Sequence, residues 1–131
     1  FQEVLKINPR FAPAANNLAW LLMERGGNLD VALSYAQTAR EVMPNDPNIA
    51  DTLGWIYYQK KVYLLATVLL KEAAEKISED PIVVYHYGMA IFKSGSKSEA
   101  KQWLEKSLTL NPNHQGAAEV KATLATMAST P

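Results

Sequence analysis

Residues 16–23 (NNLAWLLM), 51–58 (DTLGWIYY) and 85–92 (YHYGMAIF) share one pattern that decides the fold. The three stretches begin 35 and 34 residues apart. In each, a large residue precedes an Ala or Gly at the fourth position, and bulky apolar residues stand at the fifth and eighth positions. A pattern that recurs with such a period indicates a repeat protein, in which each unit is one supersecondary element that must stack on its neighbours.

A second set of small residues extends this period along the chain. Ala32, Ala66 and Ala100 are spaced 34 and 34 residues apart. The single extra residue of the first unit falls in the loop at 26–28 (GGN), where an insertion is tolerated. Within the units the apolar residues recur at helical spacing. The sequence therefore predicts helices at about 13–25, 29–42, 48–60, 63–77, 82–94, 97–110 and 115–128.

This pattern resembles the tetratricopeptide repeat family. The shared features are the 34-residue period, a small residue in the middle of the first helix, an Ala on the packed face of the second helix, and a closing Pro. They are carried by Leu18, Ala19, Leu22, Ala32, Ala39, Pro44, Leu53, Gly54, Tyr57, Ala66, Ala73, Tyr87, Gly88, Ile91, Gly95, Ala100, Leu104 and Pro112. Three positions depart from the pattern, where Lys61 replaces the turn Gly, Ser78 the closing Pro and Ser107 an Ala.

The resemblance implies an all-α fold, a right-handed superhelical solenoid of antiparallel helix pairs. It divides the chain into a second-helix remnant of a truncated repeat (1–11), three repeats (12–46, 47–80 and 81–114) and a C-terminal capping helix with its tail (115–131). The first helices that start at 14–20 (AANNLAW) and 51–55 (DTLGW) look like those of bacterial members of the family.

The composition excludes several classes of protein. Of 131 residues, 48% are hydrophobic and 20% are charged, which is typical of a globular chain. The 13 basic and 13 acidic residues balance, so the chain lacks the charge of a general nucleic-acid binder. With no cysteine, it has no disulfide, no Cys-ligated metal and no thiol nucleophile. No apolar run approaches the ~20 residues that span a bilayer. We expect no nucleic-acid partner and no membrane insertion, and the compartment, cytoplasmic or periplasmic and envelope-associated, stays open.

No motif for catalysis is evident. The two histidines, His86 and His114, are 28 residues apart, and the sequence arranges no carboxylate beside either. We interpret them as ordinary helix-surface and loop residues. Phosphate-binding loops, nucleophile elbows and His/Glu metal spacings are not found. We therefore expect a protein that is not an enzyme and that carries no cofactor and no metal.

The informative residues lie on the first helix of each pair, outside the core columns. Spacing of four and seven residues places three columns of the first helices on one face. The family resemblance implies that this face lines the concave groove of the superhelix, where it binds a protein or peptide partner. The predicted groove consists of Asn16, Trp20, Met23, Asp51, Trp55, Tyr58, Tyr85, Met89 and Phe92. The alternative is that these large groups pack on one another and thicken the core.

The family's best-known specialised groove is a carboxylate clamp, which uses Lys, Asn and Arg to hold the acidic C-terminal tails of heat-shock chaperones. The matching positions here hold Asn16, Trp20, Thr52, Ile82 and His86. Because none of these is Lys or Arg, the sequence argues against that clamp.

Two other functions compete with a partner-binding scaffold. One is self-association, in which Phe1, Val4 and Leu5 of the truncated repeat bury against a second copy to form a homo-oligomer. The other is an accessory role in a bacterial envelope secretion or exopolysaccharide system.

Overall fold

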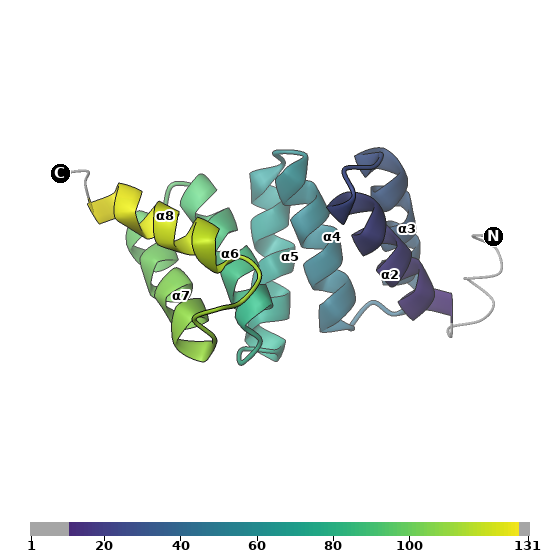
Figure 1. Ribbon diagram of the computed structural model, residues 1–131. Coiled ribbons are helices and arrows are strands. Elements are labelled where there is room, and N and C mark those ends of the chain that lie inside the picture. The colour runs from purple at the N-terminus through teal and green to yellow at the C-terminus, as the bar shows by residue number, and fades with distance from the viewer. Residues whose placement is uncertain (1–10, 129–131) are drawn as a thin grey trace.

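The computed structural model describes residues 11–128 and places seven α-helices in that range, with no β-strand among the described residues. The helices follow one another along a single axis, with α2 and α3 at one end and α7 and α8 at the other (Figure 1). They are α2 (Phe11–Glu24), α3 (Leu29–Val42), α4 (Pro47–Gln59), α5 (Tyr63–Lys76), α6 (Pro81–Lys93), α7 (Lys97–Leu110) and α8 (Ala117–Ala128). Every expected helix is present, with ends within two residues of the expected ones. The second-helix remnant expected at 1–11 lies outside the described residues, except that Phe11 begins α2.

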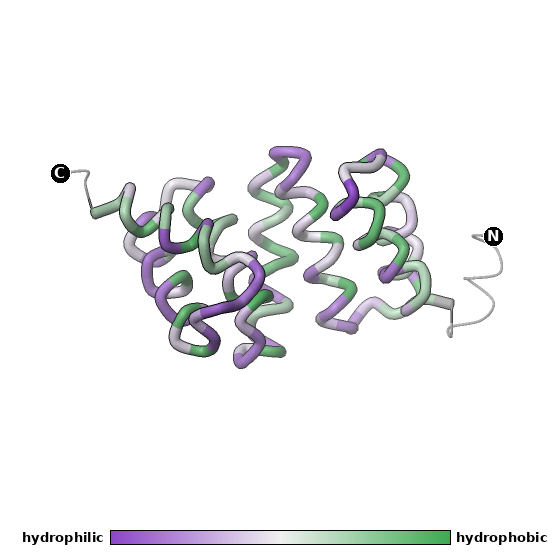
Figure 2. The backbone as a smooth tube through the Cα atoms, in the orientation of Figure 1, coloured by the Kyte–Doolittle hydropathy of each residue, from purple (hydrophilic) through white to green (hydrophobic). Residues whose placement is uncertain are grey.

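Side-chain caps explain where several helices begin. Asp46 Oδ1 accepts hydrogen bonds from the backbone N–H groups of Asn48 and Ile49, at 2.8 and 3.3 Å. Asp80 caps α6 in the same way, and Asn28 caps α3. These oxygens satisfy backbone donors that the first helical turn leaves without a partner. Short hydrophilic loops then join helices whose chain is largely hydrophobic (Figure 2).

Small residues allow the two helices of a pair to approach closely. A Cβ added to Gly54 of α4 would lie 2.7 Å from Leu70 Cγ of α5, and one added to Gly88 of α6 would lie 2.8 Å from Leu104 Cδ2 of α7. Both leucines are fully buried. The contact leaves no room for a side chain, which explains why the first-helix column holds only Ala or Gly.

The pairs stack so that α2, α4 and α6 lie next to one another. We call the surface that these helices share with α8 the inner surface. Helices α3, α5 and α7 form the other layer, and there Arg40 of α3 makes a bidentate ion pair with Glu72 of α5 at 2.6 and 2.8 Å. The hydrogen bonds from Arg40 lower the pKa of the Glu72 carboxyl. Helix α8 crosses obliquely in front of α6 and α7 (Figure 1).

Candidate functional site

The inner surface brings the predicted groove residues together. Trp55, Tyr85 and Met89 belong to one buried cluster, and Trp20, Met23, Tyr58 and Phe92 pack against it. The Trp55 and Tyr58 rings are stacked with centroids 4.2 Å apart, and the Tyr85 ring lies 5.5 Å from that of Trp55. Much of this surface is closed, because Trp55 is only 8% exposed and Met89 only 3%. Asp51 and Tyr85 are also buried.

Helix α8 covers the C-terminal part of the inner surface. The Tyr85 hydroxyl donates a hydrogen bond to the carboxylate of Glu119, and the Thr123 hydroxyl lies 3.8 Å from Met89 Sδ. Each contact joins residues 34 positions apart, so α8 continues the columns of the earlier first helices. Burial, together with Glu119, raises the pKa of both Tyr58 and Tyr85. The phenols are therefore neutral at physiological pH, and Tyr85 acts as a hydrogen-bond donor.

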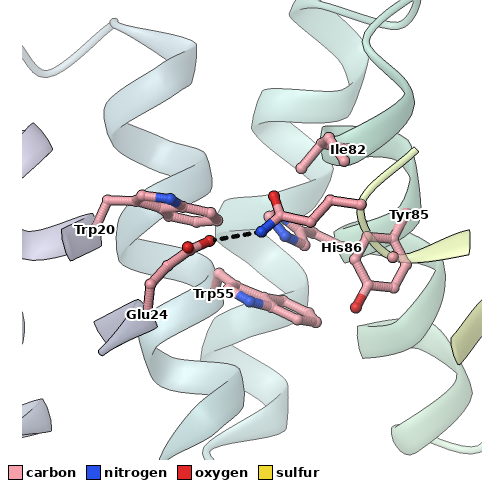
Figure 3. A pocket seen from close by; sticks show the side chains of 8 residues that line it. Trp20, Glu24, Trp55, Ile82, Tyr85 and His86 are labelled. Carbon is pink, nitrogen blue, oxygen red and sulfur yellow. Dashed lines mark hydrogen bonds between the residues drawn. The ribbon is translucent and has the colours of Figure 1, made fainter. Parts of the chain in front are cut away.

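The inner surface remains hollowed beside Trp20. One hollow, of about 240 Å³, is bounded by α2, α4, α6 and the loop that precedes α8 (Figure 3). Its lining consists of Trp20, Glu24, Trp55, Ile82, Tyr85, His86, Gln115 and Gly116. A second hollow, of about 250 Å³, shares Trp20 and Ile82 with the first. Its other lining residues are Asn16, Asn17, Asn48, Asp51, Thr52, Asp80 and Val83. We call the two adjoining hollows the Trp20 groove.

A hydrogen bond across the sequence helps to shape this groove. The Gln115 side-chain amide donates to Glu24 Oε1 over 3.1 Å, which ties the loop before α8 to the end of α2 (Figure 3). Trp20 is half-buried, whereas Glu24 is exposed. Three of the predicted residues, Asn16, Asp51 and Tyr85, also line the groove. Met23, Tyr58, Met89 and Phe92 line neither hollow.

The expectation that His86 is an ordinary surface residue is wrong. Its side chain is 2% exposed and stacks on Trp55 with ring centroids 4.0 Å apart. His86 Nδ1 lies 2.8 Å from Asp51 Oδ1, so a carboxylate does stand beside this histidine. Because a carboxylate only accepts hydrogen bonds, Nδ1 carries the proton and donates it to the bond. The sequence missed this pair because the two residues are 35 positions apart, one position off the column spacing that joins Asp51 to Tyr85.

His114 is also buried rather than a simple loop residue. Its Nδ1 accepts a hydrogen bond from the Gly116 backbone N–H at 3.0 Å, and its Nε2 lies 3.1 Å from Ser107 Oγ. Ser107 donates its own proton to the Leu104 carbonyl, so Nε2 of His114 donates to Ser107. Burial, reinforced by the charges of His86 and Lys121, lowers the pKa of His114. The Ser107 that departs from the family pattern is thus a partner of this neutral histidine.

The chemistry available at the site is recognition. The His86–Asp51 pair has no Ser, Thr or Cys within its described hydrogen bonds to activate. In residues 11–128 no group of three or more His, Asp or Glu side chains is placed to ligate a metal ion. Within the same range no helix combines the length and apolarity needed to cross a bilayer.

Comparison with known proteins places this geometry in a fold family. No family model matches the chain. The transcriptional regulator HilA of Salmonella typhimurium is 32% identical over 92 residues, which cover 69% of this chain and 16% of HilA. The TPR repeat-containing protein YpiA of Bacillus subtilis is 30% identical over 94 residues, which cover 70% of this chain and 22% of YpiA. The chain thus spans about a fifth or less of these curated relatives.

Among solved structures, the first TPR of Spaghetti (RPAP3) bound to the HSP90 peptide SRMEEVD superposes with a TM-score of 0.77 at 20% identity. The match covers 95% of this chain and 99% of that one. The chain therefore has the tetratricopeptide repeat fold, as its sequence predicted. The expected all-α solenoid of antiparallel helix pairs is confirmed with it.

Proposed function

We propose that this chain is a non-catalytic protein-interaction module that binds a peptide or helical segment of a partner protein in the Trp20 groove. The observation that carries this proposal is the pair of adjoining hollows beside Trp20, on an inner surface that is otherwise closed. Residues from α2, α4 and α6 and from the loop before α8 converge there. The structurally similar RPAP3 domain binds a peptide of HSP90, which supports a binding role for this fold.

The proposed binding surface is narrower than the nine residues expected from the sequence. Trp20 is its centre because it lines both hollows and keeps part of its indole accessible. Trp is favoured at the energetic centres of interfaces, since it buries a large area with few rotatable bonds. Met89 and Trp55 act from below as the packed floor that positions Trp20 and His86.

A matched pair of Trp variants tests the proposal. Trp20→Ala removes the accessible indole of the groove, whereas Trp103→Ala removes a half-buried indole of α7 that lies against Tyr87, with ring centroids 4.9 Å apart. Circular dichroism first establishes that both variants fold. In affinity capture from the source cell, we expect a partner that the wild type and Trp103→Ala retain and that Trp20→Ala loses. Equal capture by both variants would place the binding surface elsewhere.

Self-association is a second candidate, because an apolar surface is exposed on α5. Leu64 is 81% exposed and Val68 is 65% exposed, and Val62 and Leu65 are exposed beside them. Contiguous apolar surface of this kind marks interfaces more often than it occurs by chance. This surface differs from the one expected at Phe1, Val4 and Leu5, which lies outside the described residues. Sedimentation of the wild type and of Leu64→Lys discriminates: dimers lost on substitution support the α5 surface, and monomers at high concentration exclude it.

A further inference from the structure

We propose that the segment bound in the Trp20 groove carries a Lys or Arg side chain, which enters the groove against Trp20 and is held by carboxylates of the chain. This inference rests on the proposed function and names the chemistry of the partner. It follows from the charge, the aromatic wall and the unused acceptors of the groove.

The lining of the groove is negatively charged although the chain as a whole is neutral. Glu24, Asp51 and Asp80 contribute carboxylates from three different elements. Among the described lining residues there is no Lys or Arg, and His86, the one group able to become positive, already binds Asp51. Because 13 basic residues balance 13 acidic ones over the chain, this local excess is a property of the groove. A concave surface lined by one sign of charge attracts ligands of the opposite sign.

Trp20 supplies a second feature that suits a cation. Figure 3 shows the Trp20 indole and the Glu24 carboxylate bordering the same space, with His86 and Ile82 across from them. The face of an indole attracts an ammonium or guanidinium group, and the apolar stem of Lys or Arg packs along Trp20 and Ile82. A Lys or Arg side chain can therefore satisfy the aromatic wall and the carboxylate at once.

The groove also holds more hydrogen-bond acceptors than its own donors satisfy. Asn16 Oδ1 is buried on its wall and accepts no hydrogen bond. Asp51 and Asp80 each use one carboxylate oxygen, for His86 and for the cap of α6, and the second oxygen accepts no hydrogen bond from the described residues. A guanidinium or ammonium group brings several donors and no acceptor, which matches this surplus. An acidic tail would bring further acceptors instead.

The experiment selects ligands from a random dodecapeptide library displayed on phage, using the immobilised wild-type chain and discarding peptides that also bind Trp20→Ala. Synthetic peptides from the selection are then titrated by fluorescence anisotropy. Each is compared with versions in which one Lys is replaced by acetyl-lysine or one Arg by citrulline. The same titrations use Glu24→Gln, which removes a groove charge, and Glu75→Gln, which removes the charge of an exposed residue of α5 outside the groove lining.

We expect the groove-dependent peptides to share one Lys or Arg, whose neutral replacement weakens binding to the wild type by about tenfold or more. The same replacement should matter less than about threefold in Glu24→Gln, while Glu75→Gln should behave as the wild type. Groove-dependent peptides that share no cationic residue, or that share an acidic one, would overturn the inference and leave the proposed function standing. A selection that yields no Trp20-dependent peptide would overturn both.

Discussion

His86 Nδ1 donates a hydrogen bond to Asp51 Oδ1 across 2.8 Å and so joins α6 to α4 beneath the Trp20 groove. The imidazole is stacked on Trp55 and lies 5.7 Å from the ring of Trp20. Stacking fixes the plane of the imidazole, and the carboxylate fixes its rotation. The pair therefore sets the floor of the groove and couples the second repeat to the third.

Removal of the Asp51 carboxylate should destabilise the chain. Asp51→Ala leaves the buried Nδ1–H of His86 without an acceptor, which costs about 1–3 kcal/mol of unfolding free energy. Asp51→Asn should cost less, because its amide oxygen can still accept the hydrogen bond. Urea denaturation followed by circular dichroism measures both losses.

Asp30→Ala is the matched control for this experiment. Asp30 pairs with Lys60 at the surface, and its side chain is 79% exposed. An exposed pair contributes less than about 1 kcal/mol. A loss for Asp51→Ala no greater than that for Asp30→Ala would contradict a structural role for the buried pair.

Lys61→Gly should stabilise the chain. Lys61 has a φ of 67° at the end of α4, and the equivalent turn positions hold Gly26 and Gly95, with φ values of 69° and 100°. A residue with a Cβ pays roughly 1–2 kcal/mol for this left-handed conformation, so replacement by Gly should recover up to about 1 kcal/mol. The free energy of unfolding in urea provides the measurement. Gly95→Lys is the converse variant and should lose stability, whereas equal stability of all three chains would refute the strain.

His114 should make stability depend on pH. Its pKa is lowered in the folded chain, so the folded state binds fewer protons than the unfolded state. The stabilisation is complete above the ordinary histidine pKa of about 6.5 and is lost as the pH falls through the lowered pKa. Protonation of Nδ1 would also remove the acceptor for the Gly116 N–H. Unfolding free energies between pH 8 and pH 5 should fall more steeply for the wild type than for His114→Gln, and parallel profiles would exclude this histidine as the cause.

The sequence predicted the helices because their determinants are local and repeated. Caps such as Asp46 and Asp80, and close contacts such as that of Gly54 with Leu70, recur at the repeat period. These features require only that neighbouring units stack in the same way. The fold and the helix ends therefore follow from one chain without an alignment.

The candidate site was harder to predict because it depends on how successive units are rotated. Trp55, Tyr85 and Met89 were placed on the correct face, but their burial arises from contacts with adjacent units. Glu119 and Thr123 lie 34 residues after Tyr85 and Met89, so the period did contain the position of α8 on the inner surface. These residues are polar, and the hydrophobic pattern therefore gave no signal for them.

The attachment of α8 supplies the last prediction. Gly116 lies so close to Tyr85 that an added Cβ would overlap the ring at Cε2 and Cζ. Both Tyr85 and the loop are held in place, the former by Glu119 and the latter by His114. Gly116→Ala should therefore displace the start of α8 at a cost of about 1–3 kcal/mol, rather than be absorbed by a flexible side chain. Hydrogen exchange should show faster exchange in α8, with α2 and α3 as internal references. Unchanged protection of α8 in the folded variant would show that the loop yields without releasing the helix.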